Sequence, residues 1–140
     1  MTSSSRVADR PTWLLSRASA RAHALLTEAF ASAGVRGYHF RLLAALEADG
    51  PCSQADLARA TGIDRSDVVA ALDELSGWGL ARRDPDPGDR RRNLVSLTEA
   101  GAARLDELDV VVGQVQDTLL EPLSPSERTA LVRILRKLGG

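Results

Sequence analysis

The 140-residue sequence has few aromatic residues, which make up 4% of the chain while hydrophobic residues make up 44%. A core must therefore be built mainly from Leu, Val and Ala, and this favours closely packed helices over a β-sandwich. With 26% charged residues the composition is that of an ordinary globular chain, which excludes a fibrous repeat or a disulfide scaffold. We expect one domain, with room for an oligomerisation appendage.

Cysteine and long hydrophobic runs are also scarce. The single Cys52 can form no internal disulfide and has no thiol partner for a metal site, so a reducing compartment fits best. We interpret it as an inert packed thiol, with a redox sensor as the alternative. No run approaches the roughly 18 apolar residues of a membrane span, and residues 1–10 lack a secretory apolar region. These absences predict a cytoplasmic protein with no membrane partner, no metal and no cofactor.

The net charge of −1 gives no overall electrostatic reason to expect nucleic-acid binding, so any such binding must come from local arrangement. All basic residues except Lys137 are arginines. Arginine suits bidentate recognition of phosphate or guanine, although a GC-rich genome produces the same bias. The sequence also lacks Gly-x-Ser-x-Gly, a phosphate loop and His-Glu-x-x-His, so we do not expect an enzyme.

Helical periodicity dominates what is present. Apolar residues recur at helical spacing from Pro11 to near Gly34, and again from Tyr38 to a turn at 49–51. Near the other end, Thr98 caps a long helix. The sequence 124–127 is then a capping box with proline at the first helical position of a last helix.

Two shorter helices lie between these. Ser53 caps the first, with Asp56 in place of the usual Glu, and Gly62 ends it. Asp64 caps the second, which ends at Trp78. A connection of about three residues containing glycine is helix-turn-helix spacing. Strand-like alternation follows in 80–83 and 93–97, and we expect 84–92 to form a proline-rich hairpin tip.

This order of elements resembles the MarR family of bacterial transcriptional regulators over roughly residues 12–138. The likeness is carried by SQADLARATG (53–62), LSGWGLARR (75–83), DPDPGDRRRNLVSLTEAG (84–101) and LSPSERTAL (123–131). The resemblance implies a mainly α fold with a small β-wing, in which N- and C-terminal dimerisation helices frame a winged helix-turn-helix. The expected divisions are a disordered N-terminus (1–10), a dimerisation helix (11–36), the DNA-binding domain (37–100) and dimerisation helices (101–140).

The wing is the most specific part of the resemblance. We expect Arg90, Arg91 and Arg92 on a proline-stiffened turn, with Arg91 entering a narrow minor groove. The family pattern Asp-x-Arg falls on Asp89 and Arg91, so Asp89 is expected to hold Arg91 by an ion pair. Arg90 and Arg92 are then phosphate contacts. A solvated charged loop is the alternative.

The second of the two short helices, from Asp64 to Trp78, is the recognition helix of this motif. It is less basic than the resemblance leads one to expect. Its DNA-contact candidates are Arg65, Ser66 and Asp67, joined by Gln54 from the preceding helix. Asp67 either supports the cap at Asp64, which we favour, or accepts a hydrogen bond from a cytosine amino group. Between 54 and 97, seven basic residues stand against eight acidic ones. That balance motivates the alternative of a winged-helix protein-interaction module that does not bind DNA.

The terminal helices carry apolar stripes larger than a winged helix can cover, which predicts a homodimer on a pseudo-palindromic operator. The interface and core candidates are Leu14, Leu15, Val115, Leu119, Leu120, Leu123, Leu131 and Leu135.

The resemblance also places an effector pocket near the first two helices, with candidates Trp13, Arg17, His23, Tyr38 and His39. Such a pocket suits an aromatic carboxylate or phenolate, and Trp13 is its expected fluorescent reporter. Ordinary packing and surface roles are the alternative for these residues. The predicted function is a repressor released by a small aromatic ligand.

Overall fold

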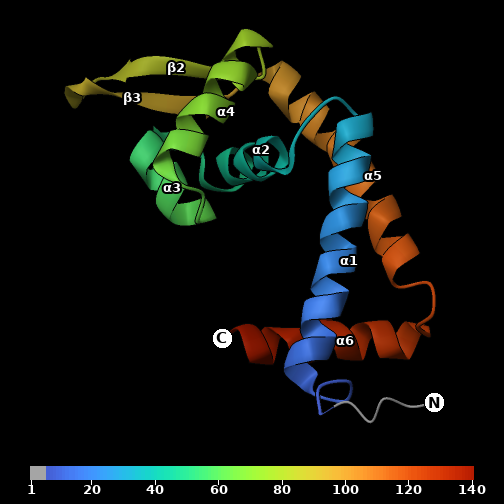
Figure 1. Ribbon diagram of the computed structural model, residues 1–140. Helices are drawn as coiled ribbons and strands as arrows, with labels where there is room; N and C mark the ends of the chain where they lie inside the picture. The colour runs from blue at the N-terminus through green and yellow to red at the C-terminus, as the bar shows by residue number, and fades with distance from the viewer. Residues whose placement is uncertain (1–5) are drawn as a thin grey trace.

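Two long helices run side by side and carry a smaller bundle and a hairpin at one end (Figure 1). They are α1 (Pro11–Ser32) and α5 (Glu99–Leu119) in a computed structural model that describes residues 6–140. The other elements, in chain order, are α2 (Gly37–Asp49), β1 (Cys52–Ser53), α3 (Gln54–Thr61), α4 (Arg65–Gly77), β2 (Ala81–Asp86), β3 (Asp89–Leu97) and α6 (Pro125–Gly139). The predicted mainly α fold with a small β-wing is confirmed, and no helix in the described part is long and apolar enough to span a membrane.

The helix ends follow the predicted capping residues. The Ser53 hydroxyl accepts a hydrogen bond from the Asp56 N–H at 3.1 Å, and Gly62 ends α3 in the left-handed region with φ 69°. Thr98 caps α5, and Ser124 and Glu127 form the predicted reciprocal capping box of α6. These caps satisfy backbone N–H groups that have no partner within their own helix.

The segment predicted to be disordered, 1–10, is described only from residue 6. Residues 6–9 form a turn, and the Arg10 N–H donates to the Val7 carbonyl at 2.9 Å. Pro11 then opens α1 at a position where its missing N–H costs nothing. The remaining part of this prediction, residues 1–5, lies outside the described residues.

The sheet differs from the prediction in two ways. The short strand β1 was missed, and it pairs antiparallel with β3 to give the strand order β1-β3-β2. The expected nine-residue tip is also wrong, because β2 continues through Asp86 and β3 begins at Asp89. Pro85 is tolerated because β2 is an edge strand and its register shifts between Pro85 and Asp86. Arg90, Arg91 and Arg92 therefore lie on β3 and not on a turn.

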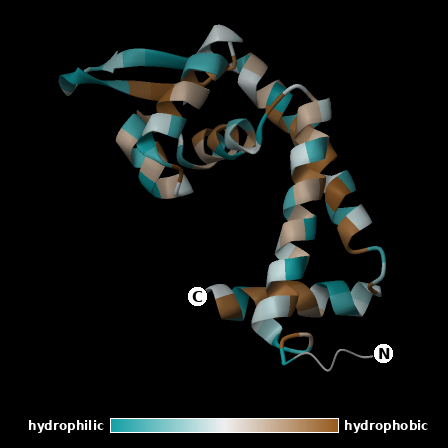
Figure 2. Cartoon of the chain, in the orientation of Figure 1, coloured by the Kyte–Doolittle hydropathy of each residue, from teal (hydrophilic) through white to brown (hydrophobic). Residues whose placement is uncertain are grey.

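Apolar burial is concentrated at the end of the molecule that carries the hairpin. Side chains with no exposed surface include Leu42, Leu43, Leu57, Val68, Leu72, Leu75, Val95 and Leu108. Of the predicted interface and core residues, Val115 is buried, Leu119, Leu120, Leu123 and Leu131 are half-buried, and Leu14, Leu15 and Leu135 are exposed. Helix α6 buries no residue, and Figure 2 shows hydrophobic segments along it.

Helix α5 meets the loop before the hairpin with no space between them. A Cβ atom built on Gly101 would lie 2.0 Å from the Leu80 carbonyl oxygen and 2.8 Å from the Leu97 Cδ1 atom. The Thr98 hydroxyl donates to the Gly79 carbonyl at 2.7 Å, which holds the first turn of α5 against the same loop. Glycine at position 101 is therefore required by close approach of two backbones.

We expect Gly101→Ala to lower the free energy of unfolding by about 1–3 kcal/mol or more, because the backbone carbonyl it meets cannot move aside cheaply. Gly113→Ala is the matched control, since nothing lies within 4 Å of its Cβ position on the same helix. Gly113→Ala should raise the free energy of unfolding by about 0.5–1 kcal/mol. Urea unfolding at equal protein concentration measures both, and equal stabilities of the two variants would contradict the close contact.

Candidate nucleic-acid interface and adjoining cavity

A small cleft lies where α3, α4 and the hairpin meet. Its volume is about 300 Å³, and its lining consists of Ser53, Gln54, Ala55, Arg65, Arg91, Arg92 and Asn93. Four of the predicted DNA-contact residues, Gln54, Arg65, Arg91 and Arg92, are thus brought together, whereas Ser66, Asp67, Asp89 and Arg90 do not line the cleft. The lining includes three arginines and no acidic residue, so the cleft suits an anion such as a backbone phosphate.

The ion pair predicted on the wing is confirmed. Arg91 Nε lies 3.2 Å from Asp89 Oδ1, and the same oxygen accepts from the Arg91 backbone N–H at 3.0 Å. The Arg91 side chain is 92% exposed, so the contact with Asp89 orients it while most of its surface faces solvent. This arrangement presents a guanidinium to solvent at a defined place on β3.

Arg92 has a different environment. Its Nε donates to Asp86 Oδ2 at 2.7 Å, and Asp86 Oδ1 accepts from the Gly88 N–H at 2.8 Å. The hydrogen bond from Arg92 lowers the pKa of the buried Asp86 carboxyl and raises the pKa of Arg92. Sequence reasoning missed this pair, because Asp86 was assigned to the hairpin tip and no partner was predicted for it. Arg92 stabilises the hairpin, and its phosphate contact stays a prediction.

The start of α4 corrects the interpretation of Asp67. The Asp64 carboxylate accepts from the Ser66 N–H at 3.2 Å and also from the Ser66 hydroxyl. Hydrogen bonding from Ser66 lowers the pKa of Asp64. The favoured role of Asp67 as hydrogen-bonding partner in this cap is wrong, because Ser66 fills that role and the Asp67 side chain makes no hydrogen bond or ion pair within residues 6–140. Asp67 places an acidic group in the first turn of α4. Arg65 and Ser66 are both exposed on the first turn.

Arg83 joins the wing to both helices of the helix-turn-helix. Its Nη2 lies 2.7 Å from Asp73 Oδ1 on α4, and its Nη1 donates to Gln54 Oε1 on α3 at 3.5 Å. Because three elements meet at one guanidinium, the hairpin keeps a fixed position relative to α3 and α4. The amide oxygen of Gln54 is used in this contact, which leaves its NH₂ group for a ligand.

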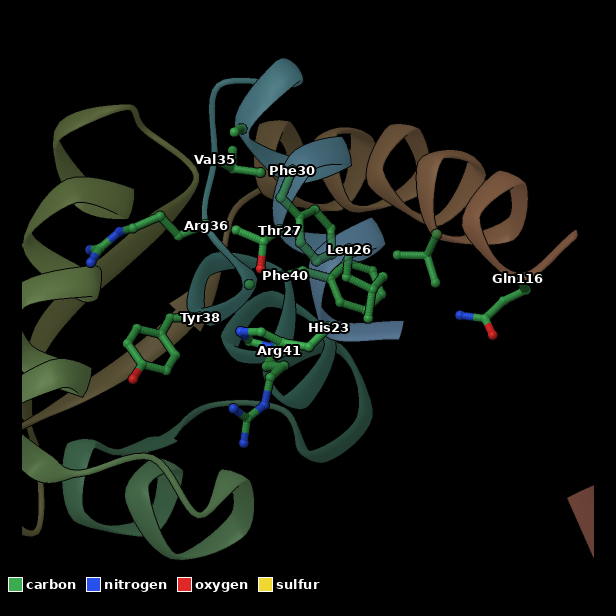
Figure 3. A pocket seen from close by; sticks show the side chains of 13 residues that line it. His23, Leu26, Thr27, Phe30, Val35, Arg36, Tyr38, Phe40, Arg41 and Gln116 are labelled. Atoms are coloured by element: carbon green, nitrogen blue, oxygen red, sulfur yellow. The ribbon is translucent and has the colours of Figure 1, made fainter. Parts of the chain in front are cut away.

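A larger cavity of about 510 Å³ lies between α1, α2 and α5 (Figure 3). Apolar side chains form much of its wall: Leu26, Phe30, Val35, Phe40 and Val112. The rings of Phe30 and Phe40 are stacked with centroids 5.6 Å apart. The polar lining residues are His23, Thr27, Arg36, Tyr38, Arg41 and Gln116, and no acidic residue lines the cavity. An apolar wall with basic side chains at its edge and no acidic residue suits a small aromatic anion.

Only two of the predicted pocket residues, His23 and Tyr38, line this cavity. Trp13 and Arg17 do not, because they lie on the first turns of α1 and contact each other, with the guanidinium carbon 4.9 Å from the ring centroid. Trp13 is about 15 Å from His23 along the helix axis, at about 1.5 Å per residue. The expectation that Trp13 reports on the cavity is therefore wrong for a single chain.

His39 is a buried packing residue and not part of the cavity lining, which corrects the prediction for it. Its Nδ1 accepts from the Arg36 N–H at 2.9 Å, its Nε2 lies 3.3 Å from Glu74 Oε1, and its ring meets Trp78 edge-on at 4.8 Å. Desolvation by burial lowers the pKa of His39, although hydrogen bonding and charge from Glu74 oppose that shift. The acceptor role of Nδ1 requires the neutral ring with its proton on Nε2.

Sequence reasoning missed most of the cavity. Arg36, Phe40 and Arg41 flank the predicted Tyr38 and His39, so a basic and aromatic cluster at 36–41 was the available signal. Val112 and Gln116 come from α5, which packs beside α1 only in the folded chain. No sequence pattern of α5 marks those two positions.

Known proteins share both the sequence and the fold of this chain. A family profile described as MarR family matches residues 33–92. The HTH-type transcriptional repressor NicR of Pseudomonas putida is 35% identical over 125 residues, which cover 89% of this chain and 79% of NicR. The similarity therefore extends beyond the helix-turn-helix into the terminal helices.

Two solved structures are similar over nearly the full length. BpsR of Bordetella bronchiseptica, whose DNA binding is regulated by 6-hydroxynicotinic acid, has 33% identity and a TM-score of 0.80, with 94% of each chain covered. The transcriptional repressor CouR, solved bound to a 23-mer DNA duplex, has 29% identity and a TM-score of 0.88. The match covers 100% of this chain and 99% of CouR.

We expect the thermal midpoint to fall as the pH is lowered from about 7.5 to about 5.5. The unfolded chain binds a proton at His39 near the ordinary value of 6.5, whereas the folded chain resists protonation. Stability from this group is complete above that value and is lost as the pH falls through it toward the lowered folded pKa. Differential scanning fluorimetry across this range measures the slope.

His39→Asn should flatten that slope, because an amide oxygen can accept from the Arg36 N–H but does not titrate. His23→Asn is the matched control and should keep the slope of the unmodified protein, since His23 is exposed. Equal slopes in all three proteins would show that burial of His39 does not link folding to pH.

Proposed function

Since the chain belongs to the MarR family of transcriptional regulators, we propose that it is a homodimeric repressor that a small aromatic acid releases from its operator. It is a DNA-binding regulator and not an enzyme, as its 35% identity with the repressor NicR supports. The observation that carries the proposal is the arginine-lined cleft between α3, α4 and the wing. A regulator of transcription acts where the bacterial chromosome lies, so we also propose a cytoplasmic location.

The proposed DNA contacts fall into two groups. Arg65, Ser66 and Asp67 on the first turn of α4 face the major groove, where a recognition helix reads base edges with its N-terminal residues. Arg91 on β3 reaches the flanking minor groove, with Asp89 orienting it, and Arg90 contacts a phosphate. The remaining candidates, Gln54 and Arg92, line the cleft and contact a backbone phosphate.

The cavity between α1, α2 and α5 is the proposed effector site. Its apolar wall accepts an aromatic ring, and Arg36, Arg41 and His23 lie on its polar side for a carboxylate. The similarity to BpsR, whose DNA binding is regulated by 6-hydroxynicotinic acid, supports an aromatic acid of this size. Tyr38 and His23 remain as proposed ligand contacts from the sequence prediction, and Trp13, Arg17 and His39 do not.

The unburied apolar face of the terminal helices supports the proposed dimer. Leu14 and Leu15 on α1 are 48% and 41% exposed, and Ile134, Leu135 and Leu138 on α6 are 44%, 42% and 65% exposed. Faces of this kind are usually covered by a partner. Two-fold symmetry then repeats the recognition helix about 34 Å away and requires a pseudo-palindromic operator.

Arg91→Ala should weaken binding to a duplex from the protein's own upstream region by about 1–3 kcal/mol. The thermal midpoint should hardly change, because the side chain is 92% exposed. Arg17→Ala is the matched control, since it removes the same charge from α1 far from the helix-turn-helix. Fluorescence anisotropy at fixed salt measures both, and equal losses would indicate only nonspecific charge attraction. Asp89→Asn should weaken binding to the duplex by a smaller free energy than Arg91→Ala does.

Light scattering should give twice the 15.0 kDa chain mass at micromolar concentration. Leu135→Asp should shift the protein toward monomer and weaken operator binding, because a charge in an apolar interface is costly to desolvate. Val69→Asp is the control in the light-scattering measurement. Val69 is 40% exposed on α4, away from the terminal helices, so this substitution should leave the dimer mass unchanged. A stable monomer of the unmodified protein would contradict the proposed assembly.

A further inference from the structure

Both arginines that line the cavity also bind the helix-turn-helix. The Arg36 guanidinium pairs with the Glu74 carboxylate on α4, and the Arg41 guanidinium donates to the Thr61 carbonyl at the end of α3. In Figure 3 the Arg36 side chain points away from the phenyl rings and toward the helix beside it. The cations available to a ligand are therefore already engaged by the two helices that form the DNA-binding motif.

The Arg36 contact continues along α4 through Glu74. Glu74 Oε1 accepts from Arg36 Nη2 and also lies 3.3 Å from His39 Nε2. His39 in turn packs edge-on against Trp78, the residue that caps the end of α4. The Arg36 backbone N–H donates to His39 Nδ1, so the same arginine also fixes the start of α2. A chain of direct contacts thus joins the cavity to the C-terminal end of the recognition helix.

The charges favour exchange of partners at Arg36. No acidic residue lines the cavity. A carboxylate bound there therefore competes for Arg36 with one protein carboxylate, that of Glu74 on α4. The Arg36 and Glu74 side chains are 54% and 42% exposed. Ion pairs with this exposure are weak and screened by salt, so a ligand that also buries its ring can displace one. Tyr38, which lies under the guanidinium at 5.9 Å, offers the ring a surface beside it.

We propose that the ion pair between Arg36 and Glu74 couples the cavity to the recognition helix, and that an aromatic carboxylate in the cavity acts by taking Arg36 from Glu74. This inference rests on the proposed function, because it assigns the regulation of that site. When Arg36 turns to the ligand, α4 loses its charged contact with the N-cap residue of α2. The buried face of α4 and the Arg83–Asp73 pair still hold it in the core, and its orientation toward the major groove shifts. Glu74 is then a positioning residue that touches neither DNA nor ligand.

The test compares the unmodified protein with Glu74→Gln, in which an amide oxygen still accepts from His39 but no longer attracts Arg36 by charge. The probes are 6-hydroxynicotinic acid and its neutral carboxamide, 6-hydroxynicotinamide. Calorimetry without DNA measures ligand affinity, and anisotropy with a duplex from the upstream region measures release. Glu107→Gln is the matched control, because it removes the partner of Arg104 in an exposed pair on α5. Thermal midpoints establish that each variant is folded.

Glu74→Gln should bind the acid about threefold more tightly or better without DNA, since Arg36 is no longer occupied. Its affinity for DNA should be lower without ligand, and saturating acid should reduce that affinity by a smaller factor than in the unmodified protein. The neutral amide should bind both proteins equally. Trp78 emission, measured in a Trp13→Phe background, should respond to the acid in the unmodified protein and less in Glu74→Gln.

Three results would overturn the inference or separate it from the proposed function. Equal acid affinity and equal DNA release in Glu74→Gln, Glu107→Gln and the unmodified protein would overturn the coupling and leave the repressor standing. Absence of acid binding to the unmodified protein would remove the proposed ligand class and the coupling with it. Tighter acid binding by Glu74→Gln in a protein that binds no duplex would support the exchange at Arg36 while contradicting the repressor.

Discussion

The uneven burial of apolar side chains is the constraint on which the rest of this structure depends. The fully buried leucines and valines belong to α2, α3, α4, β3 and the first half of α5, while α6 buries nothing. A chain with 4% aromatic residues builds this core from interlocking aliphatic side chains, which places the helices close together. The end that carries the hairpin therefore has its apolar core within one chain, whereas the other end exposes apolar surface of the kind that a partner chain covers.

The acidic residues of the helix-turn-helix and wing repel the DNA phosphates less than their number suggests. Almost all are used inside the module: Asp56 pairs with Arg59, Asp73 with Arg83, Asp84 with Arg82, Asp86 with Arg92 and Asp89 with Arg91, and Asp64 caps α4. Each pair fixes an arginine or a backbone turn and neutralises its own charge locally. Counting charges along the sequence does not show these pairings, and two of them, Asp73 with Arg83 and Asp86 with Arg92, join separate elements.

The sequence predicted the elements far better than the contacts between them. Caps such as Ser53 and Ser124 are local signals, and they marked the helix starts that the structure has. The strand β1 is only two residues long and exists because β3 lies beside it, so no local pattern reveals it. The wing ion pair between Asp89 and Arg91 was predicted from the family pattern Asp-x-Arg. Most of the cavity was missed, in part because some of its wall comes from α5. Trp13 and Arg17 were misplaced because the resemblance located the pocket only to the first two helices, and these residues lie near the start of α1, away from the cavity.

The contact at Gly101 bears on how far the protein can be divided. The Thr98 cap, the Leu80 carbonyl and the buried Leu105 and Leu108 all belong to one packed unit, so α5 begins inside the DNA-binding core. A boundary drawn near residue 100 would cut a continuous helix through its first turn. The two halves of the molecule are thus joined by a rigid shaft and not by a linker. The first turn of α5 therefore moves together with the loop that leads into the wing, because Gly101 and Thr98 contact that loop directly.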